Sequence, residues 1–206
     1  MVGVPFTECA GDDLTLEKLV GEFSSGDQVQ IPFTMSDGFL YDFVTYQYLT
    51  LNDDGMDDGW YDDTWTYIGD TVVLPQGNGI WFYSADGLKD VTLAGEVSKT
   101  VFVKTFTDPY TMTSPGFPCA FNPNDTRFSW SVSSGDQIQV PFTMSDGFLY
   151  DFVTYQYLTL NDDGMDDGWY DDTWTIIDTA IAGVGQGFWV YSLNGGSMTE
   201  TSPIVE

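Results

Sequence analysis

The chain has 206 residues, enough for one large or two small domains, and its hydrophobic (42%) and aromatic (17%) contents exclude a disordered acidic tail. Its 32 Asp and Glu residues against 5 Lys and Arg give a formal net charge of -27 without any histidine. This charge repels nucleic-acid phosphates and anionic lipids, and no stretch approaches the roughly 20 apolar residues of a membrane span, so we expect neither a nucleic-acid partner nor membrane insertion.

An internal repeat organises the chain. Residues 24–66 and 133–175 align at an offset of 109 and are the same at 41 of 43 positions. The repeat predicts two modules, the first over residues 1–100 and the second over residues 101–206. Two explanations of the identical centre stay open, namely recent duplication or conversion of the gene and selection for one surface displayed twice.

The predicted elements of the first module are mostly strands. Leu16, Leu19 and Val20 have helical spacing after residues that can cap a helix, which predicts one short helix. Val29 to Phe33 alternates apolar and polar residues, as a strand with one buried face does. Residues 41–51 and 60–65 flank a stretch of Asn, Asp and Gly and predict a long hairpin with a polar tip. Further strands are expected over residues 80–83, 91–97 and 101–106, the last as a connector between the modules.

These elements predict an all-β fold that is mainly antiparallel. We expect two tandem modules, each a β-sandwich or a partly open barrel with at most one short helix. The second module repeats the pattern, although the copies slip by one residue before Gly77-Asn78-Gly79 and Gly185-Gln186-Gly187.

Short motifs along nearly the whole chain resemble an uncharacterised β-rich tandem repeat of bacterial secreted and surface proteins. They include Gly135-Asp136-Gln137-Ile138 and Gly185-Gln186-Gly187-Phe188-Trp189, with their counterparts in the first copy. The resemblance implies an extracellular or cell-surface location and no known catalytic residues. Met1 to Pro5 lacks the basic start and apolar run of a signal peptide, which predicts a chain that is either cytosolic or already processed. The low Lys content and the abundance of Asp, Gly, Thr and Tyr favour an exported protein whose leader is not part of this chain.

The acidic hairpin tip, residues 52–63 and again 161–172, is a candidate metal site. Ca²⁺ takes six to eight oxygen ligands, and glycines allow the tight turns that aim carboxylates inward. Six carboxylates within eleven residues also repel one another, and a bound cation would offset that repulsion. The predicted ligands are Asp53, Asp54, Asp57, Asp58, Asp62, Asp162, Asp163, Asp166, Asp167 and Asp171. The alternative is a solvated turn, because Met56 replaces a ligand of the standard calcium loop and no Glu closes it.

Aromatic residues beside the tip are candidate binding groups. Exposed Trp and Tyr near Asp suit neutral sugars or partner proteins. The predicted binding residues are Trp60, Tyr61, Trp169 and Tyr170, with Trp60 and Trp169 expected outside the core. The alternative is that such rings form core and cross-strand pairs.

Catalysis has little support in the sequence. The absence of histidine removes the commonest general base, and a glycosidase would need two carboxylates at a defined separation in a cleft. We therefore expect no enzyme. The first hypothesis is an extracellular structural protein, a subunit of a self-assembling fibre or surface array stabilised by calcium, whose partner is itself through a repeated head-to-tail contact. The alternative is a glycan- or protein-binding adhesion module that uses exposed aromatic residues.

Overall fold

The computed structural model describes residues 1–7, 13–34, 41–50, 57–87, 89–107, 109–143, 150–159 and 166–204. These residues form antiparallel sheets, and no sheet among them closes into a barrel. Within the described part of the chain the only helical element is a 3-10 turn, η2 (Leu16–Lys18). The all-β prediction is therefore confirmed. No helix in these ranges is long and apolar enough to cross a membrane.

Each copy carries one five-stranded sheet, with the order β1-β8-β4-β5-β6 in the first copy and β11-β16-β13-β14-β15 in the second. The strands of the first copy are β1 (Val2–Gly3), β2 (Leu14–Thr15), β3 (Leu19–Gly21), β4 (Gln28–Thr34), β5 (Tyr41–Leu49), β6 (Gly59–Tyr61), β7 (Val73–Leu74), β8 (Gly79–Tyr83) and β9 (Val91–Leu93). The strands of the second copy are β10 (Phe102–Phe106), β11 (Tyr110–Thr113), β12 (Phe128–Ser131), β13 (Gln137–Thr143), β14 (Tyr150–Leu158), β15 (Gly168–Tyr170), β16 (Phe188–Tyr191) and β17 (Gly196–Glu200).

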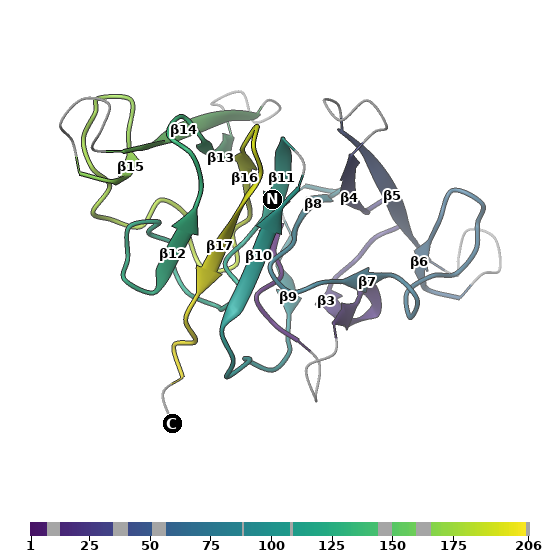
Figure 1. Ribbon diagram of the computed structural model, residues 1–206. Coiled ribbons are helices and arrows are strands. Elements are labelled where there is room, and N and C mark those ends of the chain that lie inside the picture. Colours follow the sequence, from purple (N-terminus) through teal and green to yellow (C-terminus); the bar gives the residue numbers. More distant parts are fainter. Residues whose placement is uncertain are drawn as a thin grey trace.

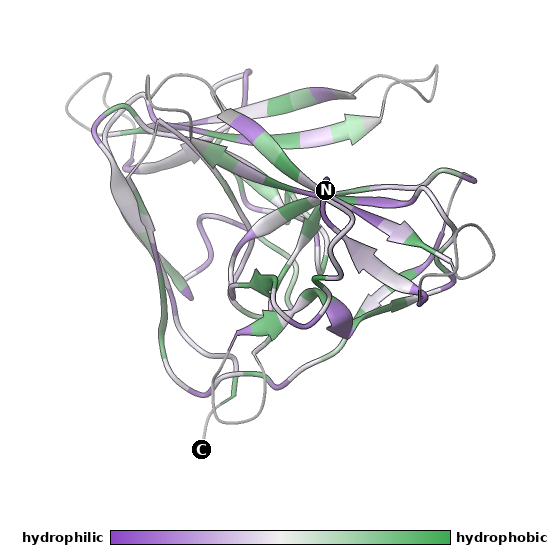
Figure 2. Cartoon of the chain, turned by 90° about the vertical axis from the view of Figure 1, so that its right-hand side faces the viewer, coloured by the Kyte–Doolittle hydropathy of each residue, from purple (hydrophilic) through white to green (hydrophobic). Residues whose placement is uncertain are grey.

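Side-chain alternation decides which face of each five-stranded sheet is buried. In β4, Val29 lies in the core, whereas Gln28 and Gln30 lie on the opposite, outer face. Figure 2 shows hydrophobic and hydrophilic residues following one another along the strands. Pro32 can occupy β4 because the pairing of β4 with β8 ends at Gln30. At position 32 no amide hydrogen is therefore needed for a bond to β8.

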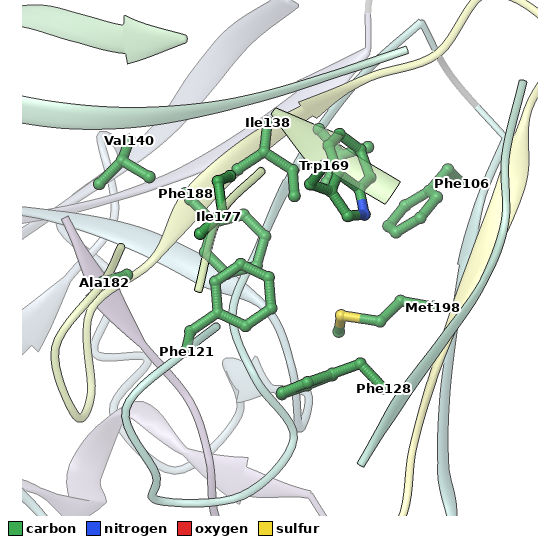
Figure 3. Close-up of a cluster of buried hydrophobic side chains, with 11 residues drawn as sticks. Phe106, Phe121, Phe128, Ile138, Val140, Trp169, Ile177, Ala182, Phe188 and Met198 are labelled. Atoms are coloured by element: carbon green, nitrogen blue, oxygen red, sulfur yellow. The ribbon is translucent and has the colours of Figure 1, made fainter. Parts of the chain in front are cut away.

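The inner faces cover two separate hydrophobic clusters. In the second copy the sheet β10-β17-β12 closes the cluster from the other side, and Phe106 of β10 is part of it. Figure 3 shows this cluster, in which Trp169, Phe188 and Met198 come from β15, β16 and β17 and Phe121 comes from the segment before β12. In the first copy the smaller pairs β2-β7 and β3-β9 take that place. Each copy is thus a small two-layered unit with its own core.

The copies meet along a seam, defined here by β1 and β11 and by the two glycine-flanked turns at residues 77–79 and 185–187. The Gly3 amide donates to the Gly185 carbonyl (2.8 Å), and the Ser114 amide donates to the Gly77 carbonyl (2.9 Å). The contact is reciprocal, because Val2 of β1 bridges Gln186 and Thr113 of β11 bridges Asn78, so the first strand of each sheet pairs with the turn of the other copy. In Figure 1 the seam lies near the N-terminus, between the first copy on the right and the second copy on the left.

Several predicted boundaries differ from the structure. The helix predicted around Leu16 is a single 3-10 turn, because Leu19 already pairs with Leu93 in the β3-β9 sheet. The strand expected over residues 91–97 ends at Leu93, although Glu96 forms an isolated bridge with Thr7. The connector over residues 101–106 is β10, which adds an edge strand to the sheet of the second copy.

Candidate functional site: twin tryptophan turns

A tight hairpin turn follows β6, and the carboxylate of Asp62 holds it. One oxygen, Oδ1, accepts from the Thr64 amide (2.9 Å), the Thr64 hydroxyl (2.7 Å) and the Thr66 amide (2.9 Å). Tyr61 and Tyr67 form an antiparallel bridge at the base of the turn. The carboxylate adds these bonds to two backbone bonds of the turn, from the Asp62 amide to the Thr66 carbonyl and from the Trp65 amide to the Asp62 carbonyl (both 3.1 Å).

The same turn recurs after β15 in the second copy. Asp171 Oδ1 accepts from the Thr173 amide (2.9 Å), the Thr173 hydroxyl (2.7 Å) and the Thr175 amide (2.9 Å). Tyr170 and Ile176 form the bridge at its base. We call residues 61–67 and 170–176 the tryptophan turns.

Each turn presents a tryptophan on an unusual backbone. Trp65 and Trp174 have φ = 62°, and they are the non-glycine residues with positive φ among those the structure describes. Left-handed backbone costs an L-residue about 1–2 kcal/mol, and this place in a hairpin loop normally takes glycine. The rings nevertheless point outward, since Trp65 is 56% exposed and Trp174 55%. In both copies a strained backbone residue therefore holds an indole in solvent.

A shallow hollow lies beside each exposed indole. In the first copy it measures about 180 Å³ and is lined by Gln47, Leu49, Tyr61, Asp62, Asp63 and Trp65. The hollow of the second copy measures about 170 Å³ and is lined by Gln137, Thr154, Gln156, Leu158, Tyr170, Asp171, Asp172 and Trp174. Both volumes are below those of sites for drug-sized ligands, so each hollow suits a group about as large as one sugar ring.

The charge state of the site follows from these hydrogen bonds. Those from Thr66 and Thr64 lower the pKa of the Asp62 carboxyl, and those from Thr175 and Thr173 do the same for Asp171. Burial, together with the negative charge of Asp62, raises the pKa of the nearby Tyr46 phenol. Near neutral pH the site therefore offers ionised carboxylates as acceptors, while that phenol keeps its proton.

The predicted exposure of Trp60 and Trp169 is wrong. Trp60 is 3% exposed and packs edge-on against Phe23 and Tyr48, with ring centroids 5.1 and 5.3 Å away. Trp169 is fully buried against Trp130 and Tyr157 (Figure 3 shows its place in the cluster). Both rings lie on the inner face, because Trp60 is paired with Tyr48 and Trp169 with Tyr157 across neighbouring strands.

Tyr61 and Tyr170 are buried too, yet they reach the candidate site. Each is 6% exposed, and each hydroxyl donates to a backbone carbonyl four residues earlier, that of Asp57 or Asp166, at 2.8 Å. Their rings line the hollows beside the tryptophans. They are walls of the site rather than free binding groups.

The predicted metal ligands are only partly described. Asp53, Asp54, Asp162 and Asp163 lie outside the described residues. Asp57, Asp58, Asp166 and Asp167 are exposed, and Asp62 and Asp171 hold the turns. Within the described ranges no three acidic, Cys or His side chains gather closely enough to hold a metal ion. Calcium at the tip stays a prediction.

Sequence reasoning missed Trp65 and Trp174 as site residues because it treated residues 60–65 as one extended run. The signal was present, since Asp-Asp-Thr-Trp-Thr contains the short polar residues that hydrogen-bond their own backbone and end a strand. A tryptophan inside such a turn cannot share the buried face of the strand before it.

A buried acid and a partly buried thiol also occur in the second copy. Glu200 Oε1 accepts from the Cys119 thiol (3.2 Å), and Oε2 accepts from the Gly116 amide (2.7 Å). Burial and the neighbouring Glu200 raise the pKa of Cys119 to about 11. A thiol with such a pKa is a poor nucleophile near neutral pH, so this pair serves the core.

No family model, curated protein or solved structure matches the chain. Function must therefore be inferred from the chemistry of the tryptophan turns and their surroundings.

Proposed function

We propose that this protein is a non-enzymatic carbohydrate-binding module that holds neutral glycans at its two tryptophan turns. The observation that supports the proposal is the exposed indole on a strained backbone, beside an ionised carboxylate, in both copies. Strain of this kind persists where the surroundings enforce it, and it gathers at functional sites.

The chemistry of the turns matches that of a sugar. The C–H face of a pyranose ring is apolar and packs on an indole, whereas its hydroxyls need hydrogen-bond partners around the rim. Trp65 supplies the flat apolar surface. The Asp63 carboxylate and the Gln47 amide line the same hollow and supply acceptors and donors.

The charge of the chain restricts the glycan class. A net charge of -27 disfavours uronate-rich or sulfated polymers, and each hollow itself contains two carboxylates. Among the residues that line the two hollows, no cationic side chain is present to bind an anionic sugar. Neutral glycans are therefore the class that the sites favour.

The fibre hypothesis stays a prediction, and so does an extracellular location. Within the chain the copies meet through a reciprocal seam, and a reciprocal contact closes on itself instead of propagating. Fibre growth would therefore need surfaces other than the one by which the two copies meet. For this reason we prefer the binding function.

Native affinity electrophoresis tests the proposal, with soluble mixed-linkage β-glucan, xylan and galactomannan as probes in separate gels. We expect at least one polymer to retard the protein. The single variants Trp65→Ala and Trp174→Ala should each lose roughly 10- to 100-fold in affinity, because two linked sites bind far more tightly than one. The double variant should migrate as it does in a gel without polymer.

The matched control is the double variant Val20→Ala and Leu193→Ala, which truncates two exposed side chains away from the turns (62% and 63% exposed). It should be retarded as strongly as the wild type. Unchanged mobility of the wild type in all three gels would contradict the proposal. So would undiminished retardation of the double tryptophan variant.

A further inference from the structure

A third hollow, called here the seam hollow, lies between the two copies and is lined by residues of β4, β5 and β8 from one and of β14 and β16 from the other. It measures about 590 Å³, within the range of sites for small organic ligands. Four of the rings that line it are equivalent pairs from the two copies, Phe43 with Phe152 and Trp81 with Trp189. The pairing means that the hollow exists only because the copies meet.

The polar lining of the seam hollow consists of the amides of Gln28 and Gln30, on β4, and the hydroxyl of Tyr83. The lining contains no carboxylate and no Lys or Arg side chain. In a chain with a net charge of -27, an uncharged pocket of rings and amides is distinctive. Its chemistry is that of a neutral ligand with flat apolar faces and hydrogen-bonding edges, which is also the chemistry inferred for the tryptophan turns.

The sheet of the first copy connects the seam hollow to the hollow of Trp65. Gln28 is directly opposite Gln47 on one side and Tyr83 on the other, and Gln47 is opposite Tyr61. Directly opposite residues share a face of the sheet. Gln47 and Tyr61 line the Trp65 hollow, and Gln28 and Tyr83 line the seam hollow. One row of tyrosines and glutamines therefore joins the two.

The second copy has a matching connection. Gln139 is directly opposite Thr154 and Trp189. Thr154 lines the hollow beside Trp174, and Trp189 lines the seam hollow. The outer faces of the two five-stranded sheets thus lead from one tryptophan turn, through the seam, to the other.

From this continuity we infer that the seam hollow is a central sugar subsite, and that the ligand is one linear neutral polysaccharide chain that crosses both copies. The inference rests on the proposed function. With neighbouring strands about 4.8 Å apart, four strands in each copy give a path on the order of 30 Å, which a polymer can follow and a trisaccharide cannot. The amides would bond hydroxyls, and the exposed Tyr83 ring would pack on a sugar face together with the half-buried rings of Phe43, Trp81 and Phe152. Trp189 is 2% exposed and supports these rings from behind.

Isothermal titration calorimetry tests the inference with β-glucan, xylan and galactomannan and with the trisaccharides cellotriose, xylotriose and mannotriose. For the sugar type that binds, we expect two trisaccharide molecules per protein, one at each tryptophan turn. The affinity for the corresponding polymer should be at least 100-fold higher than the affinity for the trisaccharide. The variants Phe152→Ala and Tyr83→Ala should each weaken polymer binding at least tenfold, while trisaccharide affinity stays within twofold of wild type.

Gln30→Ala is the third variant, because it removes one outer-face amide without opening the packing of a ring. It should weaken polymer binding three- to tenfold, and circular dichroism should match the wild type. If all three variants bind polymer as the wild type does, while Trp65→Ala and Trp174→Ala remain defective, the seam subsite is wrong and the twin-site function stands. If the wild type binds no polymer and no trisaccharide, the proposed function fails and this inference fails with it.

Discussion

The two copies present the same tryptophan turn, but different buried interactions stabilise the sheet behind it. Their tryptophan turns have carboxylate bonds of equal length, and the surrounding blocks differ only by the exchange of Val29 and Ile31 for Ile138 and Val140. Those two exchanges keep the total volume of the inner face, which a core tolerates well.

Outside the repeated blocks, the residues that stabilise the two copies differ. Asp27 is fully buried and pairs with Lys89 at 2.7 Å, whereas its counterpart Asp136 accepts from the Ser192 hydroxyl at 2.8 Å. The strand β10 has no counterpart among the described residues of the first copy. The outer face of the hairpin is thus the same in both copies, whereas the interactions that support it differ.

Removal of Asp27 should affect stability the most. Asp27→Ala removes a fully buried carboxylate that accepts from the Lys89 ammonium and from the amides of Ser24 and Ala85. Loss of three hydrogen bonds to a charged group should cost about 3–5 kcal/mol, although Lys89 keeps Asp86 as a partner at 3.5 Å. Asp136→Ala removes hydrogen bonds from two uncharged donors, the Ser192 hydroxyl and the Ser133 amide, and should cost about 1–3 kcal/mol. Urea denaturation measures both free energies of unfolding, and equal losses would show that the ion pair adds nothing.

The Asp27 pair also predicts a pH dependence. Burial raises the pKa of Asp27, but the Lys89 ammonium and the amides of Ser24 and Ala85 outweigh it, so the net pKa lies below its ordinary value. A depressed carboxyl pKa stabilises the fold above about pH 4, and that contribution is lost as the pH falls through the folded-state pKa. The stability gap between wild type and Asp27→Asn should therefore narrow below pH 4.

Substitution of the glycines in the seam turns should destabilise the two copies by different amounts. Gly77 and Gly185 both have left-handed φ, 74° and 72°, so alanine costs each about 1–2 kcal/mol. A Cβ at Gly77 would also collide with the Phe102 ring of β10, whereas nothing lies within 4 Å of a Cβ at Gly185. We expect Gly77→Ala to lose about 3 kcal/mol and Gly185→Ala about 1 kcal/mol. A larger loss at Gly185 in urea denaturation would contradict this role of β10.

The smallest effect should be a gain in stability. Trp65→Gly and Trp174→Gly relieve left-handed backbone at exposed positions, and each should raise the free energy of unfolding by about 1 kcal/mol while weakening glycan binding. Trp65→Ala is the control, because alanine keeps the backbone strain and should leave stability nearly unchanged. If both glycine variants lose stability, the indoles contribute packing that their exposure does not indicate.

The chain by itself determined the repeat, the all-β class and the position of most strands. It could do so because alternation such as that in Val29 to Phe33, and turn residues such as those after Tyr61, act through neighbours along the backbone. It also determined that aromatic and acidic residues would lie close together around the hairpin.

Tertiary structure alone decided which of these residues meet solvent. Alternation distinguishes two faces of a strand but does not say which one is covered, and a core formed with Phe23 placed Trp60 inside and left Trp65 outside. Likewise, β10 joins the second copy, and the seam hollow forms between rings more than 100 residues apart, such as Phe43 and Phe152. Such contacts depend on packing between distant segments, which no local pattern contains.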